Sequence, residues 1–255
     1  MKGETVIVTG GSSGMGKYMA KRFADDGANV VITGRNEEKL QAVKKELEET
    51  ATGKVGFVQM DVRNVDDIDR MVKETVDMFG TIDYLVNNAA GNFVVYAEDL
   101  SVNGWNSVID IVLNGTFYCS QAVGKYWIEQ KKQGSIINMV ATYAWDAGVG
   151  VVHSAAAKAG VLSLTRTLAV EWGTKYGIRV NAIAPGPIER TGGADKLMLS
   201  EEMAERTRNS IPLKRFGTPE EIAGLAAFLF SKDAAYINGE VVTMDGGQWL
   251  NQFPF

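Results

Sequence analysis

Short apolar runs alternate with amphipathic segments of helical period along the whole chain. The apolar runs are of strand length and predict strands at residues 5–9, 29–33, 55–60, 82–87, 135–139, 179–183 and 240–244. The segments between them predict helices at residues 14–26, 37–50, 65–79, 104–130, 151–176 and 219–230. Such alternation is typical of a parallel sheet covered by helices on both faces.

This pattern predicts an α/β fold, a single Rossmann-type domain over residues 1–255 with a doubly wound sheet of seven strands. Right-handed crossovers give the strand order 3-2-1-4-5-6-7, with a ligand crevice at the carboxyl edge beside the first and fourth strands. Residues 188–216 break the alternation with glycines, charges and methionines, and we expect a mobile lid on the substrate side. An ordinary surface excursion is the alternative.

Composition narrows the function classes. With 255 residues and 45% hydrophobic content the chain can bury a large core, and a net charge of -5 argues against a general nucleic-acid role. One cysteine and one histidine give no internal disulfide and no cluster with metal-ligand spacing, so we expect no metal. No apolar run approaches the roughly 18 residues of a membrane span, and the first strand begins too early for a signal peptide. We therefore expect a cytoplasmic protein.

A glycine-rich turn leads from the first predicted strand into the first helix. It reads Thr9-Gly10-Gly11-Ser12-Ser13-Gly14-Met15-Gly16. Glycines let the backbone approach a pyrophosphate, and the helix N-terminus offers it unpaired N–H groups. We therefore expect a dinucleotide here, cradled by Gly10, Gly14 and Gly16 and lined by Ser12, Ser13 and Met15.

The end of the second strand selects between the two nicotinamide dinucleotides. An acidic residue there binds a ribose 2′-hydroxyl, whereas an arginine accommodates a 2′-phosphate. This chain has Thr33-Gly34-Arg35, with no carboxylate before Glu37. NADP(H) is favoured over NAD(H), and the alternative is that Arg35 is a solvated surface side chain.

Three segments together resemble the short-chain dehydrogenase/reductase family over essentially the whole chain. They are the glycine-rich turn, Asn87-Asn88-Ala89-Ala90-Gly91 after the fourth strand, and Pro185-Gly186-Pro187-Ile188 after the sixth. The resemblance implies that Asn88 and Ala89 brace the sheet and line the adenosine side, that Asp61 and Val62 lie against adenine, and that Pro185, Gly186 and Ile188 meet the nicotinamide carboxamide. It also implies that Lys158 holds the nicotinamide ribose and that Asn114 supports this lysine.

The chain departs from that family at the catalytic positions. Most members carry Tyr-x-x-x-Lys on the fifth helix, with a serine upstream. Here Lys158 is present, but Ser154 replaces the tyrosine and Ala141 replaces the serine. An aliphatic hydroxyl is too weak an acid to protonate an alkoxide, so ordinary carbonyl reduction is not the first expectation.

The same departures resemble the NADPH-dependent 2,4-dienoyl-CoA reductases, a bacterial member in particular. The segments that carry this likeness are Asn88-Ala89-Ala90-Gly91-Asn92-Phe93, Val112-Leu113-Asn114-Gly115-Thr116, Ala141-Thr142-Tyr143-Ala144 and Ser154-Ala155-Ala156-Ala157-Lys158-Ala159-Gly160. The resemblance implies reduction of 2,4-dienoyl-CoA to 3-enoyl-CoA in unsaturated fatty acid degradation, by a homotetramer. It assigns the catalytic positions to Tyr143, Asn92, Ser154 and Lys158.

Those residue types suit the chemistry. Hydride addition to a conjugated dienoyl thioester places negative charge on the thioester oxygen, which the phenolic O–H of Tyr143 and the amide of Asn92 can stabilise as donors. Lys158 would favour the charged forms of tyrosine and dienolate. The alternatives are that Tyr143 packs beside Trp145 and that Asn92 is a turn residue. We take His153 as a bystander.

Further readings stay open at this point. A carbonyl or alcohol oxidoreductase, such as a 3-oxoacyl reductase, would use Tyr143 as a relocated acid, and a non-catalytic NADP(H)-binding sensor would not need it. The lid contains bases that could meet the phosphates of coenzyme A or form a mixed-charge solvated face with Glu201, Glu202 and Glu205. These bases are Arg190, Lys196, Arg206, Arg208, Lys214 and Arg215. Trp249, Phe253 and Phe255 suggest an apolar tail that seeks a partner surface.

Overall fold

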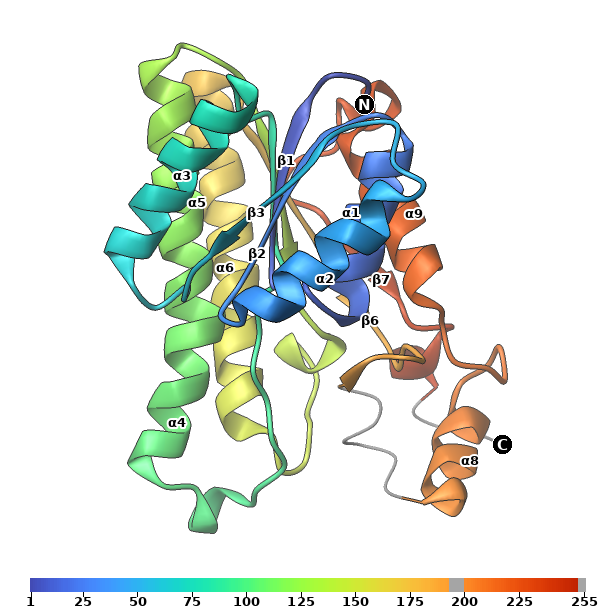
Figure 1. The fold of residues 1–255 in the computed structure, drawn as a ribbon. Helices are drawn as coiled ribbons and strands as arrows, with labels where there is room; N and C mark the ends of the chain where they lie inside the picture. Colours follow the sequence, from blue (N-terminus) through green and yellow to red (C-terminus); the bar gives the residue numbers. More distant parts are fainter. Residues whose placement is uncertain (193–199, 252–255) are drawn as a thin grey trace.

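The computed structural model describes residues 1–192 and 200–251, which fold around one parallel sheet (Figure 1). The sheet has seven strands in the order β3-β2-β1-β4-β5-β6-β7, so the predicted fold class and strand order are confirmed. The strands are β1 (Thr5–Thr9), β2 (Asn29–Gly34), β3 (Val55–Gln59), β4 (Tyr84–Asn87), β5 (Ser135–Met139), β6 (Arg179–Pro185) and β7 (Val241–Met244).

Two sets of helices cover the two faces of the sheet, on opposite sides in Figure 1. One set comprises α1 (Gly14–Asp25), α2 (Glu37–Glu48) and α9 (Pro219–Phe230), and the other comprises α3 (Val65–Phe79), α5 (Gly115–Glu129) and α6 (Val152–Tyr176). Successive residues of a strand point to opposite faces, so Val6 and Val8 enter the core beneath α1 and α9, whereas Ile7 enters the core beneath α5 and α6. Both faces are therefore apolar, as the continuous apolar runs require.

The predicted helix at residues 104–130 is interrupted. It consists of α4 (Val102–Ile109), a π-helical turn η2 (Asp110–Asn114), and α5. Within the π turn the Asn114 side chain donates to Asp110 Oδ1 at 2.9 Å. Apolar periodicity predicts where a helix runs, but it does not register a locally widened turn, which is often found near functional sites.

Residues 188–216 contain a helix that the sequence pattern did not predict. This is α8 (Glu201–Ser210), and its N-cap residue Ser200 accepts a hydrogen bond from the Met203 N–H at 3.2 Å. Figure 1 shows α8 set apart from the helices that cover the sheet. Of the basic residues and the apolar tail residues named above, Lys196, Phe253 and Phe255 lie outside the described residues. No helix in the described part of the chain has the length and apolar content needed to cross a membrane.

The N-terminus of α9 is stabilised by a capping box. Thr218 Oγ1 accepts from the Glu221 N–H at 3.3 Å, and a Glu221 carboxylate oxygen accepts from the Thr218 N–H at 2.8 Å. Replacing Thr218 with alanine removes one partner, and we expect the free energy of unfolding to fall by about 1 kcal/mol. Urea denaturation measures this, with Thr218→Ser as the control that keeps the hydroxyl. Equal stability of the alanine variant and the parent would contradict the capping assignment.

Candidate active site

The glycine-rich turn after β1 is closely packed and braced by Asn88. Gly10 has φ +64° and Gly14 has φ +49°, a region that favours glycine. A Cβ on Gly16 would overlap Asn88 Nδ2 and lie 2.5 Å from the Gly10 carbonyl oxygen. Asn88 Nδ2 donates to the carbonyls of Thr9 and Gly10 at 3.0 and 3.1 Å. The turn is thus a backbone cradle at the start of α1, suited to a pyrophosphate.

Thr9 fixes the segment that follows β4. Its hydroxyl accepts hydrogen bonds from the backbone N–H groups of Asn88 and Ala89, both at 3.0 Å. β1 and β4 are adjacent and parallel, with Val8 opposite Val86, so both turns leave the same edge of the sheet. The structure therefore brings together Gly10, Gly16, Asn88 and Ala89, as the sequence suggested.

The end of β2 offers space and a positive charge beside this turn. A Cβ on Gly34 would lie 3.3 Å from Ser12 Oγ, so the two residues are neighbours. Arg35 follows with an exposed side chain, and its carbonyl oxygen accepts from Gln59 Nε2 at 2.9 Å. A hydroxyl, a guanidinium and no carboxylate in the same place suit a phosphate group.

Asp61 and Val62 lie at the end of β3. The Asp61 carboxylate pairs with the Arg63 guanidinium at 2.5 Å, and this hydrogen bond is the main reason that the pKa of Asp61 is lowered; the charge of Arg35 contributes as well. Val62 is buried and adjoins Gly115, the first residue of α5. An ionised Asp61 keeps acceptor oxygens at the position expected for adenine.

Tyr143 and Ser154 lie in hydrogen-bonding contact. Tyr143 belongs to the 3-10 turn η3 (Thr142–Ala144) that follows β5, and its hydroxyl lies 3.1 Å from Ser154 Oγ near the start of α6. Burial raises the pKa of Tyr143, and the hydrogen bond with Ser154 opposes this shift. The tyrosine is therefore a neutral phenol that can donate. Trp145, against which Tyr143 would pack in the alternative interpretation, packs edge-on against Trp249.

Lys158 follows Ser154 by one helical turn, and both side chains are buried. Lys158 Nζ donates to the carbonyl oxygen of Met139, the last residue of β5, at 2.5 Å. Burial lowers the pKa of Lys158 to about 8. At Tyr143 the largest effect on the pKa is burial, which raises it and so favours the neutral phenol.

Asn92 lies in the loop between β4 and η1 (Ala97–Asp99). Its Oδ1 accepts a hydrogen bond from the Phe93 N–H at 2.9 Å, which fixes the orientation of the amide. This contact agrees in part with the alternative that Asn92 is a turn residue. Further along the loop the Val95 N–H donates to the Gly150 carbonyl at 2.9 Å, just before α6. The Phe93 ring meets the His153 ring edge-on, with centroids 4.5 Å apart. The loop that carries Asn92 is therefore attached to the helix that carries Ser154.

The segment after β6 returns to the glycine-rich turn. Pro185 ends β6, and the Gly186 N–H donates to the Met244 carbonyl at 3.0 Å. Ile188 is buried, and its carbonyl accepts from Thr191 Oγ1 at 2.7 Å. Thr191 would lie 3.9 Å from a Cβ on Gly14, so it borders the cradle. Thr191 is not among the site residues predicted from the sequence, where its only signal is a hydroxyl shortly after Pro185-Gly186.

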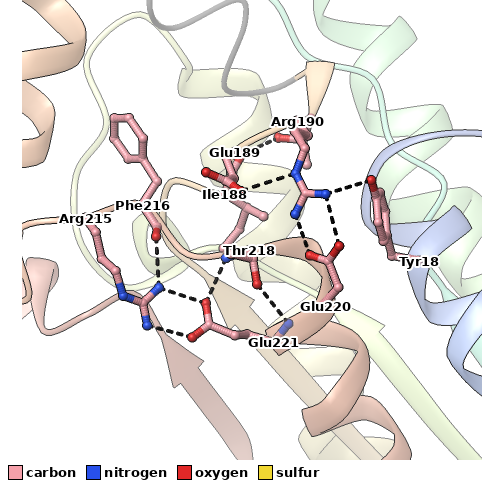
Figure 2. A network of polar contacts seen from close by, with 10 residues as sticks. Tyr18, Ile188, Glu189, Arg190, Arg215, Phe216, Thr218, Glu220 and Glu221 are labelled. Carbon is pink, nitrogen blue, oxygen red and sulfur yellow. Dashed lines mark hydrogen bonds and ion pairs between the residues drawn. The ribbon is translucent and has the colours of Figure 1, made fainter.

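Two arginines near the ends of residues 188–216 are paired with carboxylates of α9 (Figure 2). Arg190 contacts both oxygens of Glu220, at 3.0 and 2.5 Å, and also the Tyr18 hydroxyl at 3.0 Å. Arg215 contacts both oxygens of Glu221, at 3.0 and 2.6 Å. These carboxylates belong to α9, whereas the mixed-charge face predicted from the sequence involved Glu201, Glu202 and Glu205.

A third base, Arg208, has its contacts within residues 188–216. Arg208 lies 3.8 Å from a Glu201 oxygen and 5.3 Å from the centre of the Phe216 ring. In the described ranges no group of three or more His, Cys, Asp and Glu residues is arranged to hold a metal ion.

Known proteins resemble this chain over its whole length. The family model described as Enoyl-(Acyl carrier protein) reductase matches residues 10–248. A Bacillus subtilis (strain 168) protein, named probable 2,4-dienoyl-CoA reductase, (2E)-enoyl-CoA-producing, is 66% identical over 100% of both chains. An Arabidopsis thaliana protein, named peroxisomal 2,4-dienoyl-CoA reductase, (3E)-enoyl-CoA-producing, is 40% identical and covers 99% of this chain and 86% of its own.

Solved structures agree with this likeness. A short chain dehydrogenase from Bacillus anthracis has 67% sequence identity and a TM-score of 0.91, with 99% of both chains covered. A protein from Beutenbergia cavernae, described as a putative NAD(P) dependent gluconate 5-dehydrogenase with bound NADP at low occupancy, has 32% identity and a TM-score of 0.91 over 98% of both chains.

Proposed function

We propose a function from one premise: this chain belongs to the short-chain dehydrogenase/reductase family, whose fold binds a nicotinamide dinucleotide. We propose that it reduces 2,4-dienoyl-CoA to an enoyl-CoA with NADPH. The observation that carries the proposal is the 3.1 Å contact between the Tyr143 hydroxyl and Ser154 Oγ. It places a phenol beside the helix position where most members of the family have their tyrosine, and the 66% identical relative is named for this activity.

The neutral state of Tyr143 suits a donor. When the cofactor is bound, it supplies a hydride to the far end of the conjugated system. Negative charge then collects on the thioester oxygen, and a phenol that keeps its proton can hydrogen-bond this oxygen. Burial raises the pKa of Tyr143, so the proton is retained at neutral pH. Ser154 orients the hydroxyl.

Asn92 is proposed as the second donor. Its Oδ1 is held by the Phe93 N–H, which directs the donating Nδ2 end of the amide away from that backbone group. Amide and phenol donors that converge on one oxygen stabilise its charge without either having to lose a proton. Such a site favours an enolate-like intermediate over an alkoxide, which would need a proton at once.

NADP(H) is proposed over NAD(H) on the residues at the end of β2. Gly34 leaves space beside Ser12 Oγ, and Arg35 supplies the positive charge for a 2′-phosphate. A relative in structure holds NADP, which shows that this fold accommodates the phosphate. Gly10, Ser13, Met15 and Gly16 would hold the pyrophosphate at the start of α1, and Asp61, Val62, Ala89, Pro185, Gly186 and Ile188 would line the rest of the site.

The charge of Lys158 gives a testable pH dependence. Its pKa is lowered from 10.5 to about 8, so the side chain is charged below that pH and neutral above it. If the charged amine binds the ribose of NADPH, the dissociation constant should rise by up to about tenfold for each pH unit above 8. Cofactor fluorescence titrations between about pH 7 and pH 10 measure this. Lys158→Arg, which stays charged, should remove the dependence, and an unchanged wild-type affinity over this range would contradict the role.

The product isomer is a separate proposal. Protonation of the dienolate at the α carbon gives a 3-enoyl thioester, whereas protonation at the γ carbon gives the 2-enoyl isomer. The names of the relatives differ on this point, since one specifies a (2E) and the other a (3E) product. We propose the 3-enoyl product, because the α carbon of a dienolate carries more of the negative charge than the γ carbon and is protonated faster. Chromatography of the product against both standards decides between them.

Purified protein mixed with NADPH and 2,4-hexadienoyl-CoA tests the activity itself. Loss of the absorbance of the extended conjugated system, together with NADPH oxidation, is the expected result. Absence of turnover would remove the proposal. Turnover of 3-oxoacyl thioesters or simple ketones instead would show a carbonyl reductase that uses Tyr143 as an acid.

Two further features of the assignment are proposals of the same kind. We propose a homotetramer, in which α5 and α6 supply subunit contacts; both carry exposed apolar side chains, Phe117 and Val170. Light scattering on the purified protein measures the assembly. We propose the cytoplasm as the compartment, because NADPH and CoA thioesters are intracellular metabolites.

A further inference from the structure

His153 lies between the two donors of the proposed site and contacts the surroundings of both. Its side chain is 0% exposed, and none of the roles above uses it. We infer that His153 is a positioning residue that holds Ser154, and through it Tyr143, in a fixed relation to the loop of Asn92. This inference rests on the proposed function.

On one side the imidazole binds the backbone of α6. His153 Nδ1 accepts the Ser154 N–H at 2.9 Å, one of the N–H groups left unpaired at the beginning of a helix. The same residue, Ser154, contacts the Tyr143 hydroxyl through its side chain. The bond from His153 therefore fixes the first turn of α6 at the residue that orients the phenol.

That hydrogen bond also defines the state of the ring. A nitrogen that accepts a hydrogen bond carries no proton, so the neutral ring has its proton on Nε2. His153 Nδ1 is therefore the acceptor that the first turn of α6 uses at Ser154.

On its other side the imidazole packs against the loop that contains Asn92. The Phe93 ring meets it edge-on at 90°, with centroids 4.5 Å apart. The Val95 N–H binds the Gly150 carbonyl at 2.9 Å, so the loop has a second attachment close to the start of α6. Since Phe93 also donates its N–H to Asn92 Oδ1, the position of Phe93 sets the position of the amide.

The other ring nitrogen shows that packing alone does not explain this histidine. His153 Nε2 is buried and has no hydrogen-bond partner among residues 1–192 and 200–251. A buried donor without a partner is destabilising, and a phenylalanine would fill the space without that penalty. What phenylalanine cannot supply is the acceptor for the Ser154 N–H.

Two substitutions separate the two contacts. His153→Phe keeps an aromatic ring against Phe93 and removes the acceptor, whereas His153→Asn keeps an acceptor near the helix and removes the ring. We expect each to lower kcat by about tenfold or more, because small displacements of reacting groups are costly, with less than about a twofold change in the KM for NADPH. Thr75→Val, a buried change on α3 that removes only a bond to the Met71 carbonyl of the same helix, is the control and should leave both constants unchanged.

Double variants test positioning directly. If His153→Asn acts by displacing Asn92, it should change kcat by less than about twofold once Asn92 is already alanine. By the same reasoning His153→Phe should have little further effect in a Ser154→Ala background. Full additivity in both cycles, or unchanged kcat in both single variants, would overturn the inference.

A readout without turnover separates this inference from the proposed function. In protein labelled with 3-fluorotyrosine, the fluorine resonance of Tyr143 is assigned by its disappearance in Tyr143→Phe. His153→Phe should shift this resonance and Thr75→Val should not, whatever substrate the enzyme prefers. An unmoved resonance would refute the link through Ser154, whereas a shifted resonance in a protein that does not reduce dienoyl-CoA would refute the proposed function alone. If His153→Phe does not fold, Phe93→Leu and His153→Asn test the loop side by the same cycle.

Discussion

Tyr143→Phe is expected to lower kcat for a dienoyl-CoA substrate by roughly 100- to 1,000-fold. This is the effect of removing one donor from an oxyanion site, about 3 to 4 kcal/mol of transition-state stabilisation. Phenylalanine keeps the ring and the packing of η3 and removes only the hydroxyl that contacts Ser154. Steady-state kinetics with saturating NADPH measure the loss, and the free energy of unfolding should change little.

A second substitution, at the other proposed donor, and a measurement of NADPH binding test whether the loss of kcat comes from the oxyanion site. Asn92→Ala should lower kcat by a similar factor, since it removes the other proposed donor. NADPH binding, measured by fluorescence, should stay within about twofold in both variants because neither side chain is proposed to touch the cofactor. A protein that binds NADPH and loses nothing in either variant would be a sensor and not a reductase of this type.

Arg35→Asp is expected to reverse the cofactor preference. The substitution removes a charged donor from the 2′-phosphate and adds a carboxylate that repels it, yet can accept from a ribose 2′-hydroxyl. Charge-assisted hydrogen bonds are each worth about 1.5 to 3 kcal/mol, so the ratio of kcat/KM for NADPH to that for NADH should fall by roughly 100-fold or more. Kinetics with each cofactor in turn give this ratio directly.

Two controls accompany the reversal. Arg35→Lys keeps the charge without the bidentate geometry and should give an intermediate ratio. Lys45→Asp makes the same change of charge at an exposed position of α2 and should leave the ratio unchanged. If Lys45→Asp had the same effect as Arg35→Asp, the preference would come from the overall charge of the protein and not from the end of β2.

Regular periodicity made the scaffold predictable from sequence. The strands are buried on both faces, so their apolar runs are continuous, and the bounds of β1, β5, α3 and α9 agree with those predicted. The glycine-rich turn was equally clear, because positive φ at Gly10 and Gly14 and the close approach at Gly16 restrict the choice of residue. Local conformation and local sequence agree in these parts.

The sequence was less informative where loops from different strands meet. Nothing in the pattern around Val95 indicates that its N–H binds Gly150, and nothing around Thr191 indicates that it borders Gly14. The spacing of five residues between His153 and Lys158 suggests a bystander, and it gives no indication of the contact between His153 and Phe93. Such contacts depend on where the parallel strands deliver their carboxyl ends. They become visible only when the sheet is assembled.

The wide turn at Asp110–Asn114 has a consequence for chain length. A π turn accommodates one more residue than the α-helical turn that it replaces. Deleting a single residue there would therefore restore an ordinary helix rather than break it. Because the residue lost is the one that the wide turn accommodates, α4 would keep its orientation relative to α5, and Val108 would stay in the interior that it now occupies. We would expect sequences that diverge from this one to lose a residue from that turn more readily than from α4 or α5.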